Sequence, residues 1–96
     1  MNYTFHPHAE KELQEVDSFY DDISEELGKR FRKEIASTIS RILRYPRGWQ
    51  PVSKIHRRCI LNDFPYGIVY RFKPHEIRVI AVMHLHRKQD YWAYCI

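Results

Sequence analysis

FPYGIVYRFKPHEIRVIAVMH, residues 64–84, predicts two neighbouring β-strands and gives more information about the architecture than any other part of the chain. In its first half, alternate positions from Tyr66 to Phe72 are aromatic or aliphatic, whereas Val69 and Arg71 fall on the opposite side. This period of two is typical of a strand with one face in a core. Residues 63–65 and 73–75 contain turn-forming types. We therefore expect a strand over residues 66–72.

The second half of this stretch, residues 77–83, has apolar residues on both faces of the predicted strand. The odd-numbered positions from Ile77 to Met83 are expected to share one face, and Ile80 and Val82 between them are apolar as well. A strand with apolar residues on both sides is covered on both faces. We therefore expect this strand to be central in its sheet.

The first half of the chain predicts a helical hairpin. Apolar residues at three- and four-residue steps indicate one helix from Pro7 to about Asp22 and a second helix after a cap at Asp22 or Ser24. The second helix is expected to end near Tyr45, because Pro46 disfavours helical backbone at the residue before it.

Two further strands complete the predicted fold. Tyr3–Phe5 resembles a short opening strand that is expected to pair at or near the late strands, and residues 52–62 predict the first strand of the meander, in one or two arms. The fold class is therefore α+β: an N-terminal strand and an α-helical hairpin packed on an antiparallel β-meander sheet. A length of 96 residues predicts a single domain, residues 1–96.

The composition excludes several classes of protein. No apolar run approaches the roughly 18 residues that a membrane helix needs, and the N-terminus has no signal-peptide pattern, so we expect a cytoplasmic protein with no membrane contact. The two cysteines, Cys59 and Cys95, have no metal-type spacing and are expected to be unpaired thiols. Three glycines leave no phosphate-binding glycine loop, and we expect no cofactor.

Charge divides the chain into two halves. Residues 1–40 hold five Lys/Arg and nine Asp/Glu, whereas residues 41–96 hold eleven Lys/Arg and three Asp/Glu. The basic half is a candidate surface for phosphates or for an acidic protein partner. The alternative is the ordinary surface charge of a small domain.

A cluster of histidine, arginine and tyrosine follows the last predicted strand. If the strand continues that far, His84 and His86 project together, and Arg87 and Tyr91 follow, with Trp92 behind them. Such side chains can exchange protons, stabilise a phosphate transition state and stack on a base, as a metal-independent ribonuclease requires. The alternative is structural: a strand cap, an ion pair and core aromatics.

A second basic cluster lies on the first meander strand. Lys54, His56 and Arg58 alternate onto one face and form a basic ridge, with Arg57 beside them and Arg71 on the next strand. The ridge predicts contacts with nucleic-acid phosphates, or else an edge strand protected against aggregation. No set of histidines has the spacing of a zinc site, so we expect no metal.

Three segments, taken in order, carry a family resemblance. RILRYP at residues 41–46 ends the hairpin, FPYGIVY at 64–70 forms the meander, and AVMHLHRKQDYW at 81–92 ends the domain. Together with the opening strand they resemble the RelE/ParE superfamily of toxins from bacterial type II toxin–antitoxin systems, the plasmid stabilisation type. The resemblance covers about residues 2–92.

The resemblance implies a toxin that is neutralised by a cognate antitoxin, as a monomer or dimer within the complex. ParE-like members poison DNA gyrase, and RelE-like members cleave mRNA in the ribosomal A site. Ribonuclease members typically carry an arginine where this chain has Gly67, and the FPY segment is closer to the ParE side. We therefore expect action on DNA gyrase. The alternatives are a ribosome-dependent mRNA endoribonuclease, with Arg58, His84, Arg87 and Tyr91 as its catalytic residues, or a toxin-like domain without activity.

Overall fold

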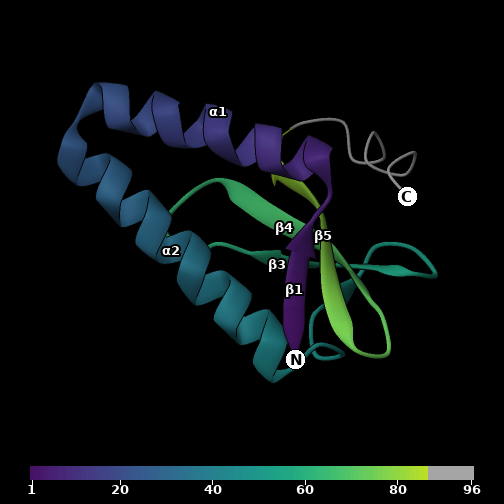
Figure 1. Cartoon of the computed structure of the whole chain (residues 1–96). Coiled ribbons are helices and arrows are strands. Elements are labelled where there is room, and N and C mark those ends of the chain that lie inside the picture. Colours follow the sequence, from purple (N-terminus) through teal and green to yellow (C-terminus); the bar gives the residue numbers. More distant parts are fainter. Residues whose placement is uncertain (87–96) are drawn as a thin grey trace.

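A computed structural model describes residues 1–86 of the chain, as two helices beside one five-stranded sheet (Figure 1). The elements, in chain order, are β1 (Asn2–Phe5), α1 (Pro7–Ile23), α2 (Glu25–Arg44), β2 (Gln50–Pro51), β3 (His56–Ile60), β4 (Tyr66–Phe72) and β5 (Glu76–His84). Neither helix is long and apolar enough to span a bilayer, within the part of the chain that is described.

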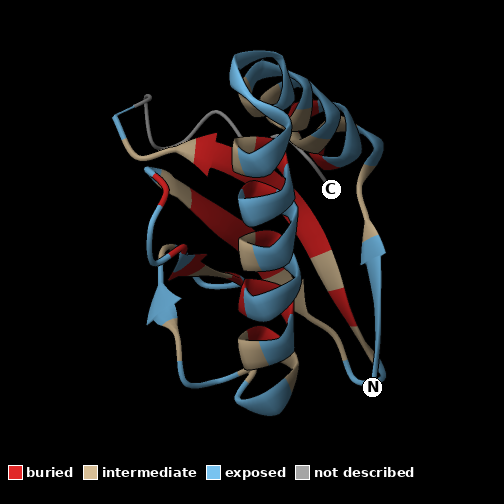
Figure 2. Cartoon of the chain, turned by 90° about the vertical axis from the view of Figure 1, so that its left-hand side faces the viewer, coloured by how far each residue is buried: buried red, intermediate tan, exposed pale blue. Residues whose placement is uncertain are grey.

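The sheet has the strand order β1-β5-β4-β3-β2. β1 runs parallel to β5, with Phe5 opposite Val79, and the other neighbours are antiparallel. Both helices lie on the same face of the sheet, and Figure 2 shows buried strand residues behind α2. The predicted α+β fold is therefore confirmed, including the pairing of the opening strand with a late strand, whereas the central strand is β4 and β5 lies between it and β1.

Ser24 makes the turn of the helical hairpin. Its backbone N–H donates to the carbonyl of Tyr20 at the end of α1, while its hydroxyl oxygen accepts from the N–H of Leu27 at the start of α2 (3.0 Å). One residue thus caps both helices. Just beyond it, a Cβ on Gly28 would lie 3.0 Å from the Cα of Asp21, so the close approach of the two helices requires glycine there.

The core between the helices and the sheet is built around aromatic rings. The ring of Tyr20 lies 4.9 Å from that of Phe64, and Phe31 lies 5.3 Å from Phe64. Tyr70 on β4 is fully buried, and its hydroxyl donates to the carbonyl of Pro46. Burial raises the pKa of Tyr70 to about 12, because the phenolate would have to form out of contact with water.

A β-bulge breaks the predicted alternation of β5. Val69 pairs with Ala81 but the next residue of β4, Tyr70, pairs with Val79, so Ile80 has no counterpart. The side chains before and after Ile80 are therefore offset: Val79 and Val82 join the helix-facing core, whereas Ile80, Ala81 and Met83 form a separate cluster. The prediction that all odd-numbered positions of residues 77–83 share a face was wrong.

The first meander strand is shorter than predicted. The structure has strand only from His56 to Ile60 within residues 52–62, and it adds the two-residue strand β2 just before that range. The hydroxyl oxygen of Ser53 accepts from the N–H groups of Ile55 and His56 (3.2 and 3.0 Å). This side-chain turn uses N–H groups that a longer strand would have paired with its neighbour.

Glu12 of α1 supplies a hydrogen-bond acceptor to β5 beyond the end of β1. β1 ends opposite Val79, and beyond that point the N–H of Val82 donates to the Glu12 carboxylate (3.0 Å). The Glu12 residue is only 7% exposed, and its second oxygen lies 3.5 Å from the imidazole of His8. A side chain of α1 therefore extends the hydrogen bonding of β5 beyond the end of β1.

Candidate functional site

The strand register divides the predicted site residues between two faces of the sheet. His56 lies opposite Arg71, and Arg58 lies opposite Val69, on the face turned away from the helices. The predicted common face of His56 and Arg58 is present, whereas Lys54 lies in the loop before β3. Arg57 lies opposite Tyr70, on the helix side.

His56 is a buried, fixed member of the basic ridge. It is 6% exposed, and its Nδ1 lies 2.9 Å from the hydroxyl of Ser53. Burial, and then the positive charge of Arg71, lower the pKa of His56 below its ordinary value. The imidazole is therefore neutral at neutral pH, and the positive charge of this region comes from the surrounding arginines and Lys54.

Arg58 lies across the backbone of Gly67. A Cβ added at Gly67 would meet the Cγ and Cδ of Arg58 at 3.2 Å, and the Arg58 guanidinium donates to the side-chain carbonyl of Gln50 (2.8 Å). The absence of a side chain at Gly67 is therefore what allows Arg58 to lie flat on β4. An arginine at position 67 would compete with Arg58 for the same space.

His84 ends β5 on the helix-facing side of the sheet. It pairs with Tyr66, and the two rings are 5.1 Å apart in an edge-to-face contact. Together with Glu12, Glu15 and Phe19 it borders a pocket of about 270 Å³ beside α1. The bulge at Ile80 shifts the alternation by one residue and so turns His84 to this side.

His84 and His86 lie together, although β5 ends at His84 and a turn, not strand alternation, brings the two rings together. Their rings are 5.2 Å apart, and the N–H of His86 donates to Nδ1 of His84 (3.1 Å). Arg87, Tyr91 and Trp92 lie outside the described residues. Of the four residues predicted to be catalytic, the two that are described, Arg58 and His84, are on opposite faces of the sheet and do not form one site.

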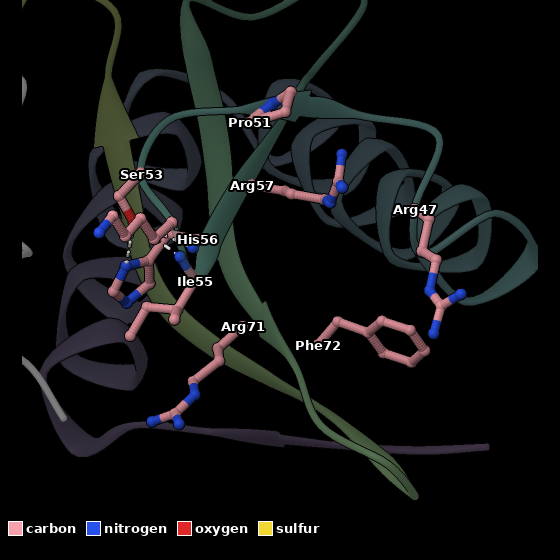
Figure 3. A pocket seen from close by; sticks show the side chains of 9 residues that line it. Arg47, Pro51, Ser53, Ile55, His56, Arg57, Arg71 and Phe72 are labelled. Carbon is pink, nitrogen blue, oxygen red and sulfur yellow. Dashed lines mark hydrogen bonds between the residues drawn. The ribbon is translucent and has the colours of Figure 1, made fainter.

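A pocket of about 310 Å³ opens beside β3 (Figure 3). It is bordered by the four cationic side chains of Arg47, Lys54, Arg57 and Arg71, together with His56 and Phe72. Arg57 donates to the carbonyl of Trp49 (2.8 Å), and the guanidinium carbon of Arg47 lies 5.2 Å from the centre of the Phe72 ring. This arrangement can attract an anion, and we call it the basic pocket.

Sequence reasoning identified four residues of the basic pocket but missed Arg47 and Phe72. Arg47 follows the second helix and Phe72 ends the strand predicted over residues 66–72, and no local pattern connects them. Their contact depends on how the loop after α2 returns to the end of β4. Within residues 1–86, no group of three or more His, Cys, Asp or Glu side chains is placed to hold a metal ion.

Comparisons with known proteins address the family directly. Residues 3–91 match the family described as "ParE toxin of type II toxin-antitoxin system, parDE". No curated protein matches the chain. A solved structure of the "Chromosomal ParDE TA system from P. aeruginosa" has a similar fold, with a TM-score of 0.73 and 18% sequence identity over 88% of this chain and 95% of that one. The chain therefore belongs to the ParE toxin family of type II toxin–antitoxin systems.

Proposed function

We propose that this toxin inhibits growth by acting on DNA gyrase in the cytoplasm and that a cognate antitoxin neutralises it. The observation that carries the proposal is the match of residues 3–91 to the ParE family. The superfamily resemblance associates the ParE-like members with gyrase.

The geometry of the described residues favours gyrase over mRNA as the target. A ribonuclease site would bring Arg58 and His84 to one phosphate, but the sheet separates them. Gly67 supplies no cation, and the stem of Arg58 occupies the space that an arginine there would need. These two features argue against cleavage through the Arg58, His84, Arg87 and Tyr91 set.

The proposed antitoxin contact follows from the uneven charge of the chain. Residues 41–96 carry eleven Lys/Arg against three Asp/Glu, which suits an acidic or amphipathic segment of a partner. Such complementarity accelerates association and makes it sensitive to salt. We therefore expect the complex to form more slowly as the ionic strength rises.

The test is a pair of assays with the purified full-length chain. In the first assay, gyrase and ATP convert relaxed plasmid to supercoiled plasmid, and we expect the toxin to inhibit this conversion and to leave cleaved DNA. In the second, mRNA in a translating extract is examined for cleavage, and we expect it to remain intact. A heat-denatured sample of the chain serves as the control.

Each alternative function has its own outcome. Cleaved mRNA with normal supercoiling would establish the ribonuclease and overturn the gyrase proposal. If neither assay responds and induced expression leaves growth normal, the chain is a toxin-like domain without activity. Inhibition of gyrase that disappears when the cognate antitoxin is added would support both parts of the proposal.

A further inference from the structure

We propose that the basic pocket is a binding site for a phosphate group, carried by a nucleic-acid backbone or by a free phosphate compound. This inference goes beyond the proposed action on gyrase and does not depend on it. The pocket lies between the loop of residues 52–55 and the end of β4, so it is separate from both Arg58 and His84.

The first argument is the balance of charge around the pocket. Four of the nine residues that border it are Arg or Lys, and none is Asp or Glu. Within the described part of the chain, Arg47, Lys54, Arg57 and Arg71 form no ion pair, although four other ion pairs to Lys or Arg are present on the helices. Like charges held around one hollow repel one another, and a bound anion would relieve that repulsion.

The second argument is that several of these groups are held in place. Arg57 is half-buried and fixed by its bond to the Trp49 carbonyl, and Arg47 rests against the ring of Phe72 (Figure 3). His56 is held by Ser53 on the other side. Positioned donors lose little side-chain freedom when a ligand binds, which favours recognition of a compact anion.

The third argument concerns which anion fits. Guanidinium groups match the oxygens of phosphate in a bidentate manner, and Lys54 is exposed and supplies a further charge. The cations border a pocket of about 310 Å³ at the start of β3, Arg71 from one face of the sheet and Arg57 from the other, whereas an acidic peptide would require charges and apolar contacts spread along a groove. A phosphate group therefore suits the pocket better than a run of carboxylates.

The experiment compares two charge-matched double variants of the full-length chain. Lys54→Gln with Arg71→Gln removes two charges from the pocket, while Lys11→Gln with Lys33→Gln removes two exposed charges from the helices. Binding of inorganic phosphate, a short duplex DNA and a glutamate-rich peptide is measured by calorimetry at several salt concentrations. Thermal denaturation verifies that each variant is folded, and Arg47→Gln, at an exposed position, is a second pocket variant.

We expect the pocket double variant to bind DNA about tenfold more weakly, and the slope of its affinity against salt concentration to correspond to about one to two fewer phosphate contacts. The DNA affinity of the control should change less than about twofold. Phosphate should shift the NMR signals of residues 53–57 and leave that of His84 in place. Pocket-dependent binding of both phosphate and DNA identifies a nucleic-acid backbone as the source, and binding of phosphate alone identifies a free compound. Equal binding by both double variants, or stronger pocket-dependent binding of the peptide than of DNA, would overturn the proposal.

Discussion

Replacement of Glu12 by alanine is expected to destabilise the protein more than the replacement of an exposed helix residue would. The carboxylate accepts from the buried N–H of Val82 at 3.0 Å, and Glu12 is 7% exposed. A hydrogen bond to a charged group contributes about 1.5–3 kcal/mol, and a buried N–H left without an acceptor costs about 1–3 kcal/mol. Both figures estimate the loss of the same hydrogen bond, so they are not added together. Alanine returns a few tenths of a kcal/mol through its helix propensity. We therefore expect the free energy of unfolding to fall by about 2 kcal/mol.

Urea denaturation measures this change. With an m-value of about 1–2 kcal/mol per molar for a domain of this size, the midpoint should fall by about 1–2 M. Glu12→Gln keeps a neutral acceptor and should lose about half as much. Glu15→Ala on the same helix, at an exposed position, is the matched control and should change stability by less than about 0.5 kcal/mol.

Hydrogen exchange provides a local test of the same reasoning. The Val82 amide should lose protection in Glu12→Ala by more than the change in global stability accounts for, because its own acceptor has been removed. If Glu12→Ala and Glu15→Ala have equal midpoints, or if Val82 keeps its protection, the carboxylate does not complete the edge of β5.

Three further predictions concern single sites. Burial raises the pKa of Tyr70 to about 12, so the stability that the neutral phenol contributes is complete below about pH 10 and is lost as pH rises toward 12. The midpoint of denaturation, measured between pH 8 and 11, should therefore fall for the wild type at the upper end of this range, and fall less for Tyr70→Phe. Burial and the charge of Arg71 lower the pKa of His56, so the stability that the neutral imidazole contributes is present above pH 6.5 and is lost as the pH falls below it. The melting temperature should therefore decline less in His56→Gln than in the wild type as the pH is lowered from 7.5, and identical declines would contradict this. Gly67→Arg should lower the free energy of unfolding by about 1–3 kcal/mol, because the new side chain displaces that of Arg58. The same variant should not cleave mRNA in a translating extract, since His84 remains on the other face of the sheet.

The periodic parts of the chain were predictable because their patterns are local. The apolar stripe of α2 faces the core as expected, and of the two predicted caps, Asp22 and Ser24, it is Ser24 that caps the helix. Alternation in Tyr66–Phe72 likewise gave β4 its correct face. In these cases, neighbouring residues carry the whole signal.

The parts that were missed depend on contacts between distant segments. Ile80, Ala81 and Val82 are all apolar, so a sequence pattern cannot reveal that one of them is an extra residue without knowing its pairing with β4. The bond from Val82 to Glu12 joins residues 70 positions apart, and Arg47 meets Phe72 only through the path of a loop. The separation of Arg58 and His84 on opposite faces likewise depends on strand pairing and on the bulge.

The bulge at Ile80 accommodates one extra residue in β5 and so determines the face on which the later residues of the strand lie. A strand has only two faces, and the bulge keeps two consecutive residues, Ile80 and Ala81, on the same one, so that the pairing with β4 continues beyond them. Removing Ile80 would make β5 regular while Val79 and Ala81 kept their partners Tyr70 and Val69, so His84 would remain opposite Tyr66 on the helix side. A regular strand of the same length, with Ile80 paired, would instead place His84 on the Arg58 side, so in toxins of this architecture the position of the histidine depends on whether the last strand carries a bulge, even where its neighbours in the sequence are identical.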